Sequence, residues 1–196
     1  SYINPFVSGM DERYDIVIHG SDQIWRKQSE TNAYNPVYFG NHSISSKWKI
    51  TYAASMGTLP TQESDFLRVK ELLSYLDVIS VREQKLLEFV KTLGYKNVRL
   101  DLDPTLLVDV NQWIEMFALI KRTDRGRYAL YYKIMNSFDI NKLERYACSR
   151  GLSLIVLHHK AIFKESDTQI SSADPKQFLE LIYNAELVIT SSFHGL

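Results

Sequence analysis

Three groups of polar residues in the sequence could do chemistry, and each follows a short apolar run typical of a buried strand. They lie at residues 19–25, 80–83 and 190–195. In parallel α/β sheets, ligands bind at the carboxyl ends of the strands. The positions of these groups therefore predict binding or catalytic sites at such sheet edges.

The first group combines a flexible backbone position with short polar side chains. Gly20 lets the chain turn, and Ser21, Asp22 and Gln23 follow it. The segment can be a capped turn with Trp25 packed over it. It can also bind the hydroxyls of a sugar, because the Asp22 carboxylate could accept a proton and the Gln23 amide both donates and accepts hydrogen bonds.

The second and third groups suit the binding of anions. Arg82 and Glu83 can form a surface ion pair worth about 0–1 kcal/mol, or Arg82 can present a planar guanidinium to a carboxylate or phosphate. The third group holds three hydroxyls, His194 and Gly195. It is either a capped turn or an anion site at the start of a following helix. Residues 158–160 (His-His-Lys) form a weaker fourth cluster.

The elements that must position these groups alternate between apolar strands and amphipathic helices. Strands are predicted at residues 15–19, 49–55, 77–81, 98–102, 128–134, 152–157 and 187–190. Helices are predicted at residues 64–76 with Ser64 as N-cap, 83–93, 110–117 and 140–149, and from Pro175 onward, with a long loop over residues 161–173. This alternation predicts an α/β fold with a mostly parallel sheet.

The pattern restarts after the polar segment at residues 121–127, so two Rossmann-like halves are predicted, over residues 1–120 and 121–196. No strand with a glycine-bearing turn precedes residue 15, and the chain stops where a helix should begin. We therefore expect a piece of a longer protein whose second half is truncated.

The composition of the chain and the absence of several known motifs argue against a number of functions. Lys plus Arg and Asp plus Glu both number 23, which disfavours a nucleic-acid-binding surface or a polybasic membrane tether. No apolar run approaches the ~20 residues of a membrane span. Cys148 is the only cysteine and is expected to be buried, and the histidines lack metal-ligand spacing. Dinucleotide, P-loop and hydrolase signatures are absent. We expect a cytoplasmic protein without a metal or cofactor.

Five segments together resemble the polysaccharide pyruvyl transferase family, in the order and rough spacing of that family. They are residues 15–25, 49–57, 79–83, 103–107 and 185–195. The Gly-Ser-Asp-Gln-Ile-Trp segment (20–25) and the Ser-Phe-His-Gly segment (192–195) are the most specific. The resemblance extends from about Tyr14 to Leu196.

The resemblance implies a bacterial enzyme that transfers pyruvate from phosphoenolpyruvate to sugar hydroxyls, usually as a cyclic ketal. The products are capsules, exopolysaccharides or cell-wall polymers. It implies two facing Rossmann-like domains similar to GT-B glycosyltransferases, with no metal. The acceptor is a sugar or glycan, and a lipid-linked acceptor would bring the enzyme to the membrane surface. The isolated chain could be inactive, because the family's first strand and last elements are absent.

This chemistry gives each polar group an expected role. His194 and Asp22 are the candidate catalytic residues, with Asp22 as the general base and His194 as the acid. Candidate donor-binding residues are Ser192, Gly195 and Arg82, and candidate acceptor-binding residues are Gly20, Ser21, Gln23, Tyr52 and Ser55. Two alternatives remain open: a nucleotide-sugar glycosyltransferase of GT-B type, and a non-catalytic relative that binds sugars or anions.

Overall fold

The computed structural model describes residues 13–29, 31–41, 44–122, 124–134, 138–158, 166, 168–171 and 173–192. The chain divides into two compact units, residues 1–107 and 108–196. The sequence predicts a boundary at residue 120, and helix α3 (Val110–Phe117) belongs to the second of these units.

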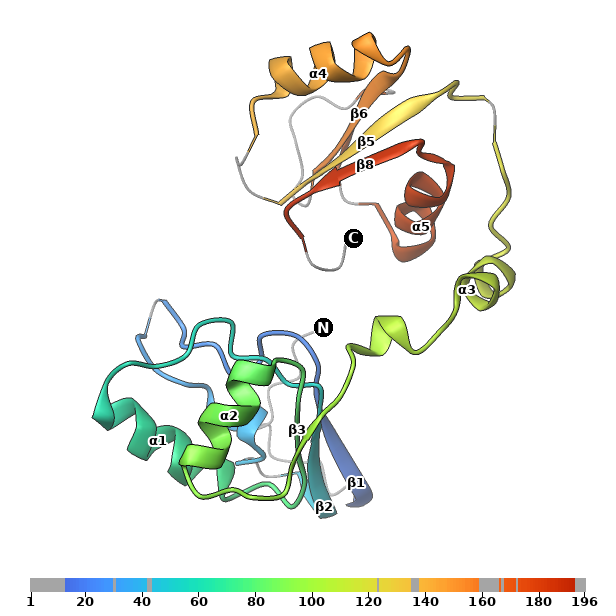
Figure 1. Cartoon of the computed structure of the whole chain (residues 1–196). Helices are drawn as coiled ribbons and strands as arrows, with labels where there is room; N and C mark the ends of the chain where they lie inside the picture. The colour runs from blue at the N-terminus through green and yellow to red at the C-terminus, as the bar shows by residue number, and fades with distance from the viewer. Residues whose placement is uncertain are drawn as a thin grey trace. The chain divides into compact units, whose positions relative to one another are not determined.

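The first unit is built on four parallel strands (Figure 1). They are β1 (Arg13–Gly20), β2 (Ser45–Tyr52), β3 (Ile79–Val81) and β4 (Val98–Leu100). β1 pairs with β2 and β3 pairs with β4. Parallel bridges from Ile50 to Val78 and from Ala54 to Val81 connect the two pairs, so the strands follow one another in chain order. The carboxyl ends of all four strands therefore lie at one edge.

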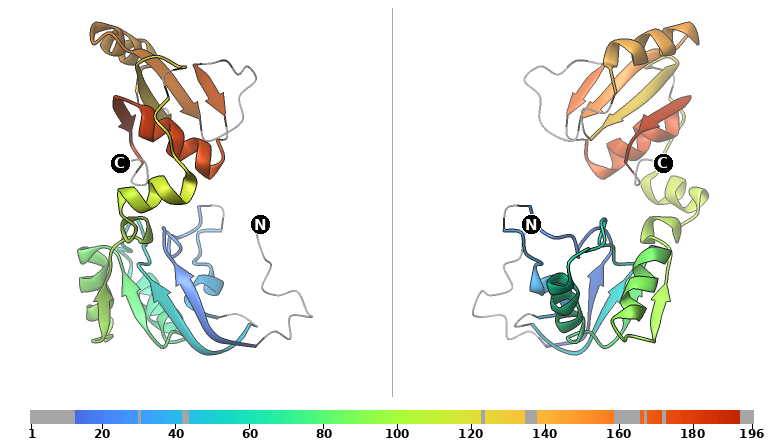
Figure 2. Two further views of the ribbon diagram at one scale, coloured as in Figure 1. Left: turned by 90° about the vertical axis from the view of Figure 1, so that its right-hand side faces the viewer. Right: turned by 60° about the vertical axis from the view of Figure 1, so that its left-hand side comes forward.

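Two α-helices cover one face of this sheet (Figure 2). They are α1 (Glu63–Leu73) and α2 (Gln84–Thr92), and two 3-10 turns, η1 (Pro36–Phe39) and η2 (Pro104–Leu106), lie in the connections. Both helices bury leucine and valine side chains at helical spacing in a core that also contains Trp25 and Phe39. The indole and the phenyl ring are stacked with centroids 5.1 Å apart. Each fully buried aliphatic side chain adds about 1.5–3 kcal/mol, so this core stabilises the unit.

The ends of these helices test the capping predictions. α1 begins at Glu63 after Gln62, which makes no side-chain capping bond, so the prediction of Ser64 as N-cap was wrong. The negative charges of Glu63 and Asp65 in the first turn instead stabilise the helix, because they lie at the positive end of its dipole. Gly94 follows the end of α2 with φ of +103°, as its position in the sequence predicted.

The second unit is a four-stranded parallel sheet in the order β7-β6-β5-β8. The strands are β5 (Tyr128–Lys133), β6 (Ser153–His158), β7 (Gln169–Ser171) and β8 (Leu187–Thr190). Helices α4 (Ile140–Ser149) and α5 (Pro175–Asn184) cover opposite faces of the sheet (Figure 1). Alternate residues of β5 therefore enter two cores: Tyr131 packs on the α4 side and Leu130 on the α5 side.

The α/β class with parallel sheets is confirmed, and two local predictions were wrong. The predicted loop at residues 161–173 contains β7, a three-residue strand in which only Ile170 is strongly apolar. Cys148 is exposed rather than buried. α4 turns Ile140, Leu143 and Ala147 toward the sheet, and the next position along the helix faces solvent.

The close approach of β1 and β2 predicts the effect of a substitution at Gly20. Gly20 pairs with Tyr52 and has φ of +150°, and an added Cβ would lie 2.1 Å from the Tyr52 carbonyl oxygen. We expect Gly20→Ala to lower the free energy of unfolding by about 3 kcal/mol. Urea denaturation followed by tryptophan fluorescence measures this change.

Gly94→Ala is the matched control, because Gly94 also has a positive φ but a Cβ there would meet nothing within 4 Å. It should cost about 1–2 kcal/mol through backbone conformation alone. Equal losses in the two variants would show that the contact with Tyr52 does not constrain the strand end.

Candidate functional site

The carboxyl edge of the first sheet gathers residues from four separate parts of the chain. Residues 20–23 lie at the end of β1 and residues 52–55 at the end of β2, while Arg82 follows β3 and residues 101–103 follow β4. Two of the predicted polar groups are thus neighbours in space. The structure joins Arg82, a predicted donor-binding residue, to the predicted acceptor-side loop.

Backbone hydrogen bonds fix the loops of this edge to one another. The Ser55 N–H donates to the Asp22 carbonyl oxygen, with an N–O distance of 2.9 Å, and the Trp25 N–H donates to the Ser55 carbonyl at 3.0 Å. The Arg82 N–H in turn donates to the Ala54 carbonyl at 3.1 Å. Asp22 and Ala53 adopt positive φ values of 38° and 47° in these turns. The loop after β1 is therefore held by the loop after β2, which is held by β3.

A buried hydroxyl network lies beneath these loops. The Ser80 side chain accepts a hydrogen bond from the Ala53 N–H at 3.0 Å and donates one to the Asp101 carboxylate at 2.6 Å. The Thr51 hydroxyl donates to the Ser80 carbonyl at 3.1 Å and accepts from the Ser80 N–H at 2.9 Å. Three strand ends are connected through Ser80.

The Arg82 guanidinium is the centre of the charged cluster. Its Nη1 donates to Asp103 Oδ2 at 2.7 Å, its Nε to Glu83 Oε1 at 3.1 Å and its Nη2 to Asp22 Oδ1 at 3.4 Å. The side-chain exposure is 1% for Asp103, 9% for Arg82 and 70% for Asp22. Asp103 therefore lies in the interior and Asp22 at the solvent, with Arg82 between them.

Two opposing effects act on the pKa of Arg82. Burial lowers it, but the hydrogen bonds and negative charges of Asp103 and Glu83 outweigh burial and raise the pKa above its usual value. Arg82 is therefore a permanent cation. Asp22, Glu83 and Asp103 carry three formal negative charges against it, so the cluster as a whole is acidic.

Asp103 was not among the predicted site residues. Its Asp-Pro-Thr context was interpreted only as a strand end and as a segment of the family resemblance. The signal that could have indicated it is its position shortly after a strand, parallel to the strands that Asp22 and Arg82 follow. The Arg82–Glu83 pair, one of the two alternatives for that segment, is present together with the contacts to Asp22 and Asp103.

A hollow of about 440 Å³ adjoins the loop after β1. Its lining is mostly polar and consists of Gln23, Ile24, Arg26, Lys27, Gln28, Ser29, Asn35 and Tyr38. Gln23 reaches it from the predicted group, and its side chain lies close over Gly57, where a Cβ would be 2.9 Å from Gln23 Oε1. The Ser55 hydroxyl is fully buried and accepts a hydrogen bond from the Gly57 N–H at 3.2 Å, so Ser55 supports this loop from inside. The Tyr52 side chain is half-buried.

In the second unit, the end of β8 forms a bonded turn. The Thr190 hydroxyl donates to the Tyr132 carbonyl at 3.2 Å and accepts from the Ser192 N–H at 2.9 Å. Ser192 is buried. His194 and Gly195, together with His159 and Lys160, lie outside the described residues. In the weaker fourth cluster, His158 Nε2 lies 2.9 Å from Gln169 Oε1.

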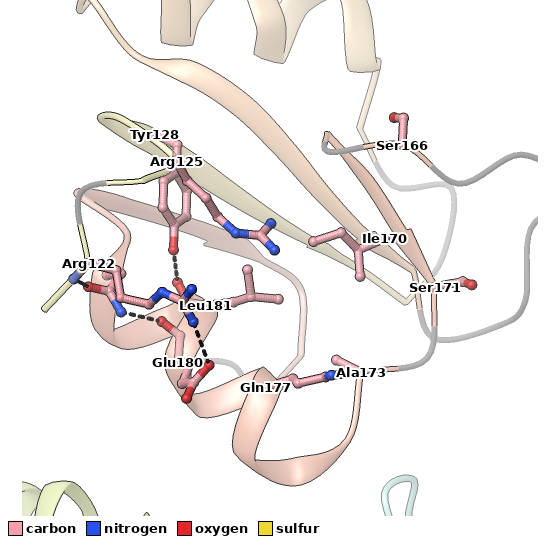
Figure 3. Close-up of a pocket in the computed structure, with 11 residues that line it drawn as sticks. Arg122, Arg125, Tyr128, Ser166, Ile170, Ser171, Ala173, Gln177, Glu180 and Leu181 are labelled. Atoms are coloured by element: carbon pink, nitrogen blue, oxygen red, sulfur yellow. Dashed lines mark hydrogen bonds and ion pairs between the residues drawn. The ribbon is translucent and has the colours of Figure 1, made fainter. Parts of the chain in front are cut away.

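A second hollow, of about 380 Å³, lies beside α5 in the second unit (Figure 3). The Arg125 side chain extends into it between Tyr128 and Ile170 (Figure 3). Arg122 pairs with Asp124 at 2.9 Å and lies 3.8 Å from the Glu180 carboxylate. Residues 121–127 were predicted only as a linker, so this hollow was not expected.

The fold and the polar sheet edge define an α/β protein with a candidate ligand site at the carboxyl ends of parallel strands. The family model for polysaccharide pyruvyl transferase matches residues 2–196, so the chain belongs to this family, as its sequence motifs indicated. No curated protein and no solved structure matches the chain significantly.

The family is one of transferases of polysaccharide pyruvylation, and it implies a polysaccharide acceptor. Within the part of the chain that the structure describes, no helix is both long and apolar enough to cross a membrane. In the same residues, no group of three or more His, Cys, Asp or Glu side chains is placed to hold a metal ion.

The hydroxyl network predicts how strongly this edge depends on Ser80. Ser80→Ala would leave the buried Ala53 N–H and the Asp101 carboxylate without their partner. Such a loss costs about 1–3 kcal/mol, and urea denaturation of the variant measures it. Ser74→Ala removes an exposed hydroxyl that donates to the Glu71 carbonyl and should change stability by less than about 0.5 kcal/mol. A Ser80→Ala variant as stable as the control would contradict this prediction.

Proposed function

We propose that this protein transfers pyruvate from phosphoenolpyruvate to two hydroxyls of a sugar in the synthesis of a bacterial surface polysaccharide. The observation that carries the proposal is the match of the family model to residues 2–196. In this reaction the methylene carbon of phosphoenolpyruvate gains a proton while one sugar hydroxyl attacks the neighbouring carbon. Phosphate leaves with its oxygen, and a second hydroxyl closes the cyclic ketal.

The acceptor sugar binds, in this proposal, at the carboxyl edge of the first sheet. Asp22 has an exposed carboxylate on a loop fixed by its backbone, and it is the general base for the attacking hydroxyl. Gly20, Ser21 and Gln23 surround it, and the adjoining polar hollow of about 440 Å³ has the size of a small-ligand site. Of the two other acceptor-binding candidates, Tyr52 lies half-buried at the end of β2 and stays in that role, whereas Ser55 is fully buried and supports the loop through the Gly57 N–H.

The donor binds at the end of β8. Ser192 and Gly195 contribute hydrogen bonds to the phosphate, and His194 protonates either the departing phosphate or the methylene carbon. Stabilising charge on the leaving group in this way lowers the barrier. Arg82 was a candidate for the carboxylate of the donor only on condition that domain closure brings it across. Its guanidinium is held within the first unit by Asp103, Glu83 and Asp22, so we assign it to that edge and not to the donor.

The proposed architecture is a pair of Rossmann-like halves arranged as in GT-B glycosyltransferases, with the domain boundary between residues 107 and 121. Such a pair brings donor and acceptor together and excludes water. The single cysteine fits a reducing compartment, so we propose a cytoplasmic enzyme, which a lipid-linked acceptor would bring to the membrane surface.

Turnover of the full-length protein tests the proposal. Incubation with phosphoenolpyruvate and a panel of glycan acceptors should release inorganic phosphate and add pyruvate to the glycan. Release of a nucleotide from a nucleotide-sugar, with no reaction of phosphoenolpyruvate, would instead indicate a glycosyltransferase. Binding of glycan without any turnover would indicate a non-catalytic relative.

Two substitutions test the assigned roles. Asp22→Asn should reduce turnover by roughly 10²–10⁴-fold, the usual contribution of a positioned base, while the fold is retained. Glu88→Gln is its control, because Glu88 is an exposed carboxylate on α2 that accepts a hydrogen bond from the Gln84 side chain. His194→Ala should lose most pyruvyl transfer, and His194→Gln should keep some donor binding. Parent-like turnover in Asp22→Asn or His194→Ala would remove that residue from the mechanism.

A further inference from the structure

We propose that Asp103 is a positioning residue of this site: its carboxylate fixes Arg82, and Arg82 in turn orients the Asp22 carboxylate toward the acceptor hydroxyl. This inference rests on the proposed function, because the role of Asp22 as base belongs to that proposal. The arrangement of the contacts within the first unit carries it.

The two carboxylate oxygens of Asp103 have different partners. Oδ1 accepts hydrogen bonds from the backbone N–H of Thr105 at 3.1 Å and from its hydroxyl at 2.7 Å, so this oxygen caps η2. Oδ2 accepts from Arg82 Nη1 at 2.7 Å and from the Ser21 hydroxyl at 3.3 Å. One oxygen therefore serves the local turn, and the other serves the site.

The Oδ2 contacts reach Asp22 by two routes. Ser21 is its neighbour in the chain, and the Arg82 Nη2 lies 3.4 Å from Asp22 Oδ1. A planar guanidinium whose Nη1 and Nε are already held has a fixed direction for its remaining donors. Asp103, which is buried, and Glu83, which is partly exposed, hold these two groups, so their contacts set the position of Nη2 beside Asp22.

Burial explains why this position requires an acidic residue. A guanidinium as buried as that of Arg82 needs a charged, hydrogen-bonded partner, because an uncompensated buried charge is strongly destabilising. Asp103 is almost completely buried and supplies that partner. Asp22 is mostly exposed and makes the longest of the three contacts, so a bound hydroxyl can approach its carboxylate while its direction is maintained.

The kinetic test compares Asp103→Asn with Thr105→Val in the full-length protein. Asp103→Asn keeps the shape of the side chain and an oxygen for the cap, but it removes the charge that holds Arg82. We expect kcat to fall by about 10–100-fold, the usual cost of a misdirected catalytic group, with KM for both substrates changed less than about 3-fold. Thr105→Val removes the hydroxyl bonded to Oδ1 only, so its kcat should stay within about 3-fold of the parent.

A double variant separates positioning from a general structural effect. If Asp103 acts through Asp22, Asp103→Asn combined with Asp22→Asn should be no slower than Asp22→Asn alone. Three results would each overturn the proposal. The first is a double variant whose kcat loss is the product of the two single losses. The others are a parent-like kcat in Asp103→Asn, and equal kcat losses in Asp103→Asn and Thr105→Val. If Asp103→Asn fails to fold, Arg82→Lys replaces it in this comparison, because lysine lacks the planar set of donors and should give the same non-additive loss.

A measurement without turnover makes the two proposals distinguishable. In protein with ¹⁵N-labelled arginine, the Arg82 Nε–H signal can be assigned by its absence from Arg82→Lys. It should be sharp and slowly exchanging in the parent and in Thr105→Val, and broadened or shifted in Asp103→Asn. An unchanged signal in Asp103→Asn overturns the positioning role. A parent protein that transfers no pyruvate but shows the expected signals overturns the proposed function while supporting the fixed Arg82.

Discussion

The ion pair between Arg82 and Asp103 is the interaction on which the first unit's site depends. It joins the ends of β3 and β4 at a distance of 2.7 Å, in a position where both side chains are largely removed from water. Charges in such a place stabilise a structure only when their geometry is good and their other hydrogen-bonding groups have partners. Glu83, Thr105 and Ser21 supply those partners, and the loop that carries Asp22 is assembled around them.

Local sequence patterns were sufficient to predict most of the elements. The bounds of α3, α4 and β8 agree with their predicted ranges, because caps such as Asp139 and strongly apolar strands mark them clearly. β7 was missed because three residues with one large apolar side chain carry almost no periodic signal. Cys148 was misplaced because one helical position separates the buried face from the exposed one.

The proximity of two of the polar groups was predictable from the sequence, but the contacts between them were not. Parallel strands predict that polar residues after different strands meet at one edge, and residues 20–23 and Arg82 do so. The partners themselves depend on which strands are neighbours: Ser21 and Asp103 are 82 positions apart, and Arg82 and Asp22 are 60 apart. No spacing rule within one segment contains that information, so Asp103 emerges only from the three-dimensional structure.

The separation of the hydrophobic cores has a consequence for how the sequence can vary. Each described core cluster draws all of its residues from a single unit: those in the first unit from residues 24–98, and those in the second from residues 128–189. Stability effects of substitutions that share no contacts are close to additive. A lineage can therefore change the loops and core of the first unit without compensating changes in the core of the second. This independence allows the sequences of the two units to diverge at different rates within one fold.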